Sequence, residues 1–386
     1  SSMKTSEENI YAVGDVIEVT DFVTQAKAFV PLAGPANKQG RIAADTICGI
    51  ESTYKDTQGT SILKVFDLTV ASTGINEKTA KAQNISYDKI FTYSANHASY
   101  YPGSLSMSIK TLYDPKDGKI LGAQIVGYEG SDKRNDVLAT AIRAGMKASE
   151  LKDLELSYAP PFGSAKDPVN MIGYAIDNIL TGKVKQFHHH DIEKLPKDGS
   201  IQLLDVRTDL EFENGTIPGF KNIPLDDLRN RYQELDTTKP VYLTCQIGLR
   251  GYIASRILSQ RGFDVYNLSG GYRQYNMSYG KTLPVAPINF NIETQQMENG
   301  SPQREGIFSF GQTHAPSQTS SSQTFSSQGF SSQNQASQNA AQASTGKLIQ
   351  VDACGLQCPG PIVSLSGSLK NALPGDIVEI SVTDPA

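Results

Sequence analysis

The sequence predicts a multidomain protein of α/β and α+β construction, and three observations support this prediction. The chain has 386 residues, and because a domain typically has about 150 residues, two or three folded units are expected. Strand-like and helix-like stretches alternate before residue 284, which favours mixed helices and sheets. A stretch rich in Ser and Gln, residues 312–344, carries almost no charge, so residues 285–346 are predicted to form a disordered tether.

Composition and charge exclude several classes of function. Lys and Arg total 35 against 40 Asp and Glu, a net charge of -5, and without a long basic run nucleic acid is not an expected partner. No apolar stretch approaches the roughly 18 residues of a membrane span, and the N-terminus lacks the pattern of an export signal. Four scattered cysteines are too few for a disulfide framework, which indicates reactive thiols in a reducing compartment, the cytoplasm.

The first segment, residues 9–50, is expected to form an apolar strand that ends at Gly14 and Asp15, followed by a loop and a helix. A carboxylate just past a strand end can accept hydrogen bonds from ribose-like hydroxyls, although Gly-Asp is also an ordinary turn. Cys48 falls within the expected helix, and we interpret it as a core residue.

The next segment is predicted to have one strand over residues 61–70 and a hairpin over residues 105–126 that turns at residues 114–118. Two helices follow, and their apolar residues recur at four-residue spacing, which is typical of core faces. These residues are Leu138, Ile142 and Met146 in the first helix and Ile172, Ile176 and Leu180 in the second. Three adjacent histidines, residues 188–190, are expected on a solvated linker, where they make a poor metal site.

From residue 201 the pattern changes to apolar runs over residues 201–206, 241–245 and 263–268, with a helix from about Gly251. This rhythm is typical of buried parallel strands joined by crossover helices. It indicates a second domain.

Cys245 gives the strongest chemical signal. It follows an apolar strand and precedes a helix, so loop amides and the helix dipole are expected to stabilise a thiolate and equally a persulfide anion. Gly248 lets the loop curl, and Arg250 adds a positive charge. A buried structural cysteine at a strand end is the alternative interpretation.

The spacing of this loop argues against a phosphatase. Only Gln246, Ile247, Gly248 and Leu249 lie between the cysteine and the arginine. Cysteine phosphatases, which have a similar layout, place five residues there, so this loop is expected to be too short to enclose a phosphoryl transition state.

With Asp205, Arg207 and residues 211–225, the Cys245 loop resembles the rhodanese family over about residues 184–284, because three separated motifs occur in the family's order. The resemblance implies a doubly wound α/β domain. It also implies that Cys245 carries sulfane sulfur as a persulfide, supported by the aspartate and arginine.

One position departs from the rhodanese pattern. Thr216 stands where the family usually has His. The absence of this His casts doubt on a local hydrogen bond more than on the role of Cys245 as the nucleophile. The resemblance still implies that residues 246–249 and Arg250 hold the persulfide.

The first segment resembles the last flavin-contacting element of FAD-dependent pyridine nucleotide-disulfide oxidoreductases, so residues 1–57 are expected to be the end of a FAD-binding domain. The resemblance implies that Gly14 and Asp15 lie at the cofactor and that the aspartate holds the ribityl chain. Residues 58–183 resemble the dimerisation domain of the same superfamily, which implies a homodimer.

The dimerisation segment lacks the His-Glu pair of two-cysteine members near residues 158–163. Residues 100–103 and 158–162 instead resemble the coenzyme A-disulfide reductase branch, which uses one cysteine and takes coenzyme A as its thiol. Tyrosines of that branch reach the partner subunit's active site and orient the sulfur substrate, a role carried here to Tyr158 and Tyr101. Interface tyrosines without a catalytic role are the alternative.

No Gly-x-Gly-x-x-Gly follows an early strand, so neither FAD nor NAD(P)H has its pyrophosphate loop here. The reductase cysteine is not identifiable either. The chain is therefore expected to be the C-terminal part of a longer FAD- and NAD(P)H-dependent enzyme.

After the tether, residues 348–361 are expected to form a strand that runs into Cys-Pro-x-Pro and a helix, which places Cys358 at a helix N-terminus. The stretch resembles the SirA/TusA sulfur carriers, whose sulfur-accepting cysteine matches Cys358, and residues 347–386 are expected to be part of that α+β fold. Cys354 and Cys358 lack a second ligand pair, so no metal is expected.

These expectations combine into a sulfur relay. A flavin site reduces coenzyme A persulfide, polysulfide or disulfide, Cys245 accepts or donates sulfane sulfur, and Cys358 carries it onward. Low-molecular-weight thiols and persulfides are the expected partners. A coenzyme A-disulfide reductase that serves redox balance, with accessory persulfide-binding domains, is one alternative, and an oligomerisation and interaction module without enzymatic activity is another.

Overall fold

The computed structural model describes residues 1–280, 348–352 and 377–381. The chain separates into two compact units, Ser1–Ile292 and Glu293–Ala386. The predicted tether, Cys354 and Cys358 lie outside the described ranges. Within the described part, no helix is both long enough and apolar enough to cross a lipid bilayer.

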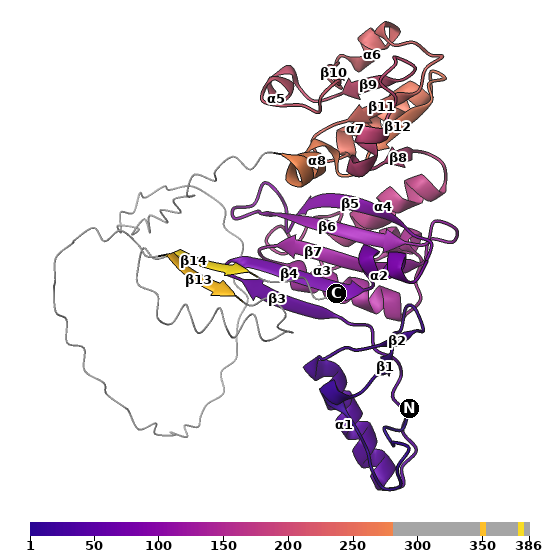
Figure 1. Ribbon diagram of the computed structural model, residues 1–386. Coiled ribbons are helices and arrows are strands. Elements are labelled where there is room, and N and C mark those ends of the chain that lie inside the picture. Colours follow the sequence, from indigo (N-terminus) through magenta and orange to yellow (C-terminus); the bar gives the residue numbers. More distant parts are fainter. Residues whose placement is uncertain (281–347, 353–376, 382–386) are drawn as a thin grey trace, which may run out of the picture. The chain divides into compact units, whose positions relative to one another are not determined.

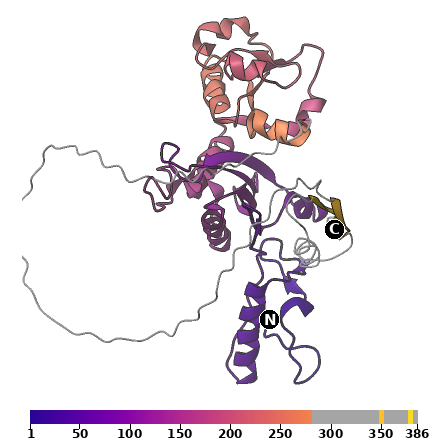
Figure 2. The ribbon, with the colours of Figure 1, turned by 90° about the vertical axis from the view of Figure 1, so that its left-hand side faces the viewer.

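The N-terminal segment contains a 3-10 helix (Gly14–Val16), β1 (Val19–Thr20), β2 (Lys27–Ala28) and α1 (Ala33–Ile47) (Figure 1). α1 lies beside the 3-10 helix (Figure 2). The predicted strand ending at Gly14 is wrong, because Gly14 adopts a φ of +77° and begins the 3-10 helix. Its N–H donates to Gln39 Oε1 of α1 at 2.7 Å and is therefore not part of a sheet.

Cys48 caps the C-terminus of α1 and is exposed. The prediction that it is a core residue is wrong, since α1 buries only Gln39 and Ala43. A helix with so narrow a buried face leaves its last residues in solvent.

An antiparallel sheet of five strands forms the next domain, in the order β3-β4-β7-β6-β5. Its elements are β3 (Ser61–Val65), β4 (Leu68–Gly74), α2 (Glu77–Ala82), β5 (Asp88–Ala95), β6 (Ser106–Tyr113), β7 (Ile120–Gly127), α3 (Ser131–Arg143), a 3-10 helix (Ala148–Asp153) and α4 (Pro168–Leu180). Leu138 and Ile142 of α3 and Ile172 and Ile176 of α4 belong to the main core cluster. The predicted core faces of both helices are confirmed.

Two boundaries in this domain differ from the predictions. The single strand predicted over residues 61–70 is wrong, because the chain turns at Phe66, with a φ of +51°, and β3 and β4 pair as an antiparallel hairpin. Gly145, at a φ of +71°, ends the first predicted helix before Met146. The hairpin predicted over residues 105–126 is confirmed as β6 and β7.

A parallel sheet of five strands follows, in the order β10-β9-β11-β12-β8. Its elements are β8 (Lys185–Phe187), a 3-10 helix (His189–Lys194), β9 (Gln202–Asp205), α5 (Asp209–Glu213), β10 (Lys221–Asn222), α6 (Leu228–Arg231), a 3-10 helix (Tyr232–Glu234), β11 (Val241–Thr244), α7 (Leu249–Ser259), β12 (Val265–Leu268) and α8 (Gly271–Tyr279). One core cluster contains residues of α6 and α7 and another packs against residues of α8. Covered sheet faces of this kind confirm the predicted doubly wound α/β fold.

In the second unit, β13 (Leu348–Asp352) pairs in parallel with β14 (Ile377–Ser381). The predicted strand ahead of the Cys-Pro-x-Pro motif is therefore confirmed.

Candidate active site

Cys245 lies directly after β11, in the loop that leads into α7. Its Sγ accepts a hydrogen bond from the Gly248 N–H at 3.1 Å. Gly248 is the N-cap of α7 and has a φ of +103°, a conformation that favours glycine. The helix begins at Leu249, two residues earlier than predicted. An amide and a helix N-terminus next to a sulfur both favour negative charge on it.

The Cys245 side chain is fully buried. Its carbonyl accepts a hydrogen bond from the Tyr272 N–H at 2.7 Å, and the Gln246 carbonyl accepts one from the Arg273 N–H at 3.0 Å. The first turn of α8 thus holds the backbone of the loop in place. Because the sulfur has no exposed surface, only a reagent that reaches into the loop can react with it, so the residues around the loop control access.

Asp205 and Arg207 form a buried ion pair beside this loop. Arg207 Nε lies 3.0 Å from both carboxylate oxygens, and Nη2 lies 2.7 Å from Oδ2. Nη2 also donates to the Gly215 carbonyl at 2.7 Å, and Nη1 donates to Gln246 Oε1 at 3.5 Å. The guanidinium stacks 4.0 Å from the centre of the Tyr272 ring. The pair therefore joins β9 to the loop and to α8.

Thr216 completes the contacts of Asp205. Its Oγ1 donates a hydrogen bond to Asp205 Oδ2 at 2.9 Å. The sequence put a hydrogen bond at this position in question because the rhodanese family usually has His there. The threonine hydroxyl makes one.

Arg250 does not hold an unshared positive charge, which differs from the expectation. Its Nη1 and Nη2 each donate to one carboxylate oxygen of Glu211, both at 2.7 Å. The hydrogen bond from Arg250 lowers the pKa of Glu211 to about 2, although burial acts in the opposite direction. The same hydrogen bond raises the pKa of Arg250. Both groups are therefore ionised at neutral pH and neutralise each other.

Tyr158 lies next to Tyr100, whereas the sequence singled out Tyr101. The hydroxyls of Tyr100 and Tyr158 are 3.2 Å apart, and both side chains are exposed. The hydrogen bond with Tyr158 raises the pKa of Tyr100. Tyr101 instead packs edge-on against His97, with ring centres 5.7 Å apart. The phenol pair able to bind a substrate sulfur is thus Tyr100 with Tyr158.

Arg134 of α3 ties together the two loops that carry these tyrosines, and no sequence motif indicates this role. Its Nη2 donates to the Asn96 carbonyl at 2.9 Å and to Asp167 Oδ2 at 2.7 Å, in a buried environment. The loops also meet directly, since the Ala98 N–H donates to the Pro160 carbonyl at 3.3 Å.

Asp15 is exposed in the 3-10 helix, and within the described part of the chain its carboxylate has no hydrogen bond or ion pair. The neighbouring Val16 is also exposed. A carboxylate in this position can accept hydrogen bonds from hydroxyl groups, such as those of a ribityl chain.

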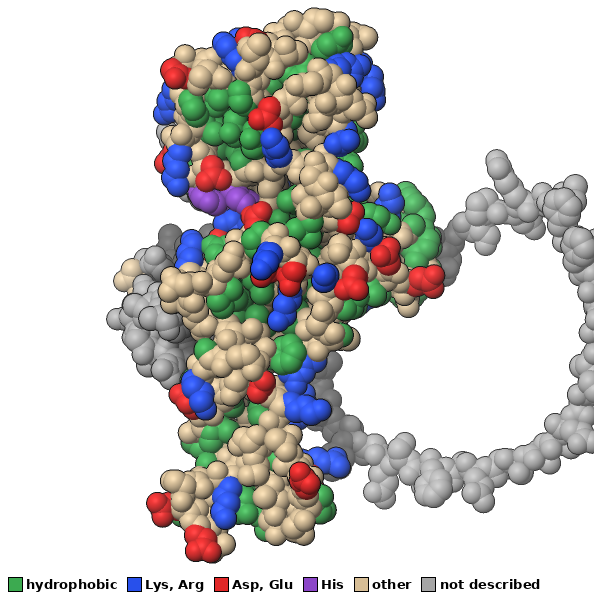
Figure 3. Space-filling model, turned by 90° about the vertical axis from the view of Figure 1, so that its right-hand side faces the viewer, with side chains coloured by type: hydrophobic (Ala, Val, Ile, Leu, Met, Phe, Trp, Pro, Cys, Tyr) green, Lys and Arg blue, Asp and Glu red, His purple; other side chains and the backbone are tan. Residues whose placement is uncertain are grey.

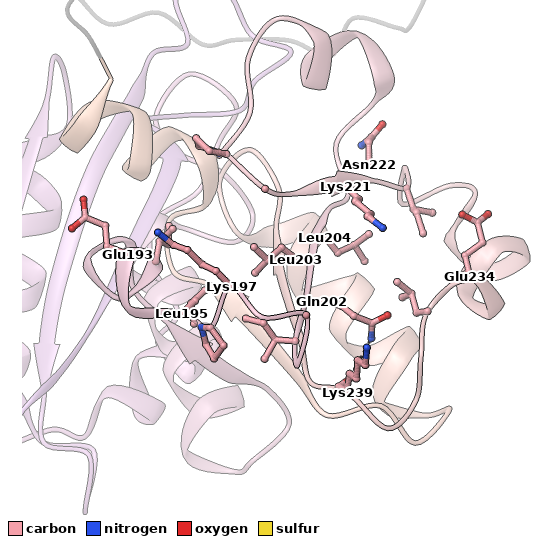
Figure 4. A pocket seen from close by; sticks show the side chains of 18 of the residues that line it. Glu193, Leu195, Lys197, Gln202, Leu203, Leu204, Lys221, Asn222, Glu234 and Lys239 are labelled. Carbon is pink, nitrogen blue, oxygen red and sulfur yellow. Dashed lines mark hydrogen bonds between the residues drawn. The ribbon is translucent and has the colours of Figure 1, made fainter.

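One hollow in the first unit lies outside the sulfur site, and another borders the Cys245 loop. A groove of about 920 Å³ is surrounded by Lys197, Lys221 and Lys239, with Glu193 and Glu234 on opposite sides (Figure 4). None of residues 245–250 lines it. The second hollow, of about 390 Å³, has residues 247–249 in its wall together with residues of β5 and α4. Among the described residues, no group of three or more His, Cys, Asp or Glu side chains is placed to hold a metal.

The prediction that residues 188–190 lie on a solvated linker is wrong. Histidine side chains form one patch on the face of the molecule drawn in Figure 3, and the His188 and His190 rings stack with centres 5.5 Å apart. His188 Nε2 lies 3.0 Å from Asp88 Oδ1 of β5, and His189 packs edge-on against Phe91. Contacts with β5, distant in sequence, therefore partly bury His188 and His189, whereas His190 stays exposed.

Replacing His189 by Gln is expected to reduce the loss of stability in acid. Burial, followed by the charges of His190 and Lys89, lowers the pKa of His189 from 6.5 to about 4. Between these pH values the unfolded chain binds a proton that the folded chain does not, so stability falls as pH falls through this window. Urea unfolding at pH 7 and pH 4 should show the wild type losing up to about 2 kcal/mol more than the variant. Equal losses would contradict this assignment.

Comparison with known proteins identifies three segments. Residues 60–168 match the dimerisation domain of pyridine nucleotide-disulphide oxidoreductases, residues 188–278 match the rhodanese-like domain, and residues 349–386 match the sulfurtransferase TusA. The predicted resemblances of these three segments to the dimerisation domain, the rhodanese family and the TusA family are confirmed. The limits given above for the five predicted segments stay predictions.

Two solved structures are similar over 71% of the chain. Reduced Bacillus anthracis CoADR-RHD is 50% identical with a TM-score of 0.69, and an NAD-dependent persulfide reductase from A. fulgidus is 37% identical with a TM-score of 0.64. The chain covers 49% of each of these proteins. A coenzyme A disulfide reductase of Staphylococcus haemolyticus is 39% identical over 172 residues, which are 44% of this chain and 39% of that protein.

The relatives are thus pyridine nucleotide-disulfide oxidoreductases, a family of FAD- and NAD(P)H-dependent enzymes, and include coenzyme A-disulfide and persulfide reductases. The chain spans half or less of the length of each relative described above.

Proposed function

Because the chain joins an oxidoreductase dimerisation domain to a rhodanese-like domain and a TusA segment, we propose that Cys245 carries sulfane sulfur as a persulfide within a FAD- and NAD(P)H-dependent reductase of coenzyme A persulfide, polysulfide or disulfide. The observation that carries the proposal is the Gly248 amide 3.1 Å from the Cys245 sulfur at the N-terminus of α7. A reducing compartment such as the cytoplasm keeps this thiol available.

The sulfur step is a displacement at sulfur. The Cys245 thiolate attacks the outer sulfur of a persulfide donor, a bond forms between Sγ and that sulfur, the donor's S–S bond breaks, and the electron pair leaves with the donor thiolate. A second thiol, which we propose is Cys358, then attacks the outer sulfur of the Cys245 persulfide and releases Cys245 as a thiolate. Both steps conserve electrons and need no separate oxidant.

The reductase step would use residues of the first two segments. FAD, when bound, would supply electrons from NAD(P)H to the substrate disulfide or persulfide. Asp15 would accept hydrogen bonds from its hydroxyls. In a homodimer formed through residues 58–183, Tyr100 and Tyr158 of one protomer would donate hydrogen bonds to the substrate sulfur at the partner's site.

Replacing Cys245 by Ser in a chain that also carries Cys358→Ser is expected to lower sulfur transfer to cyanide by about a thousandfold or more, because the variant has no nucleophile to form the persulfide. Thiocyanate formation from coenzyme A persulfide is the measurement. The Cys358→Ser background prevents the C-terminal thiol from substituting for Cys245.

Cys48→Ser in the same background is the matched control, because Cys48 is exposed at the end of α1, outside the rhodanese-like domain that carries the loop. It should leave the rate unchanged. A wild-type rate in the Cys245→Ser chain would refute the proposal that Cys245 carries the sulfur. It would favour the alternative that this chain is an oligomerisation and interaction module.

A further inference from the structure

The two arginines that contact the Cys245 loop are each paired with a carboxylate. Arg250 is held by both oxygens of Glu211, and Arg207 by both oxygens of Asp205. Within each pair a guanidinium and a carboxylate cancel, so the pairs add no net charge around the loop. The attraction of an anion to the loop is left to the Gly248 amide and the α7 dipole, which is worth about half an elementary charge.

Exposed apolar side chains lie on the two helices next to the loop, α5 and α7. Leu210 of α5 is 69% exposed, and Leu249 and Ile253 of α7 are 52% and 41% exposed. α5 and α7 are the two helices that the Arg250–Glu211 pair joins. Residues four apart on a helix share a face, so the two α7 side chains form one exposed strip. Apolar side chains at a site entrance favour a substrate that brings an organic group.

From these observations we infer that Cys245 takes sulfur from organic persulfides in preference to thiosulfate, and that Glu211 determines this preference by neutralising Arg250. The inference rests on the proposed role of Cys245 as a sulfur carrier. Thiosulfate brings two negative charges, one more than a persulfide anion, and its entry is opposed by the Glu211 carboxylate as much as it is favoured by the Arg250 guanidinium.

Both donors react by the same displacement. With an organic persulfide, Sγ bonds to the outer sulfur and the organic thiolate leaves with the electron pair. With thiosulfate, Sγ bonds to the sulfane sulfur and sulfite leaves with the electron pair. The donors therefore differ in charge and in the presence of an organic group. A substitution that changes only the charge near the loop tests the effect of the first property without changing the apolar side chains.

Glu211→Gln is expected to raise kcat/KM for thiosulfate about tenfold relative to kcat/KM for 2-hydroxyethyl persulfide, an organic monoanion without phosphate groups, because it frees the Arg250 charge for the dianion. Glutamine has nearly the same volume and can still serve the capping box that Glu211 makes with Thr208. The gain should shrink as ionic strength rises, since the pair is partly exposed.

Glu213→Gln is the matched control. Glu213 lies on the same short helix and is exposed, and its substitution removes the same charge without freeing Arg250. The ratio of the two kcat/KM values should stay within about twofold of the wild type. Arg250→Met provides a test of opposite sign, because it leaves Glu211 unpaired and should lower thiosulfate use more than persulfide use.

A wild-type protein that uses thiosulfate better than 2-hydroxyethyl persulfide would overturn the inferred preference. Equal changes for both donors in Glu211→Gln would overturn the role of Glu211 and mark it as a structural residue. In either case, an inactive Cys245→Ser variant would leave the proposed function standing, whereas an active one would refute that function itself.

Discussion

Gly271→Ala is expected to lower the free energy of unfolding by about 2 to 5 kcal/mol and to abolish sulfur charging of Cys245. Gly271 has a φ of +61°, where a side chain costs about 1 to 2 kcal/mol. A Cβ there would overlap the Cys245 carbonyl oxygen and lie 2.8 Å from the Gln246 carbonyl carbon. Both are backbone atoms, so relief requires moving the loop, and such overpacking adds about 1 to 3 kcal/mol.

Gly262→Ala separates strain from steric overlap. Gly262 has a φ of +86° in the same domain, but no atom lies within 4 Å of the position its Cβ would take. Chemical denaturation should therefore show only the backbone cost of about 1 to 2 kcal/mol, with sulfur transfer retained. If the two glycine variants lost equal stability and both kept transfer activity, the close packing of α8 against the loop would not be needed for stability or for sulfur transfer.

Arg207→Met is expected to destabilise the protein by about 3 to 5 kcal/mol, because it leaves the carboxylate of Asp205 buried without a partner. It also removes the donors that Arg207 gives to the Gly215 carbonyl and to Gln246. The loop should then lose its fixed position and the rate of sulfur transfer should fall. Adding Asp205→Asn should recover part of the stability, because the buried charge is then absent.

Arg231→Met is the control for this substitution. Arg231 pairs with Glu234 in the same domain, but the two side chains are 40% and 51% exposed. Pairs in solvent contribute about 1 kcal/mol or less, so urea unfolding should detect little change. If Arg207→Met lowered the free energy of unfolding by as little as Arg231→Met, the ion pair of Arg207 with Asp205 would not be what stabilises the Cys245 loop.

The Cys245 loop could be predicted from sequence because its determinants are local. An apolar strand, a cysteine, a glycine and a helix within about ten residues fix the amide that faces the sulfur, as the contact from Gly248 confirms. The parallel strands of the rhodanese-like domain were predictable for the same reason, since apolar runs and turn residues define them.

The contacts that decide charge and position were not predictable, because they join segments far apart in the chain. Glu211 reaches Arg250 from another helix, and Tyr158 meets Tyr100 across two loops held by Arg134. A motif cannot distinguish Tyr100 from Tyr101 when the fold of the loop decides which one meets Tyr158. Consecutive glycines ahead of Tyr272 were a usable signal for the docking of α8, and it was missed.

The persulfide itself is the most direct test of the central claim. The chain is incubated with coenzyme A persulfide, the remaining thiols are alkylated, and the peptide that contains Cys245 is analysed by mass spectrometry. One additional sulfur atom on Cys245, absent from Cys245→Ser and released by cyanide, is the expected result. An unmodified Cys245 under conditions in which the exposed Cys48 gains sulfur would contradict the account.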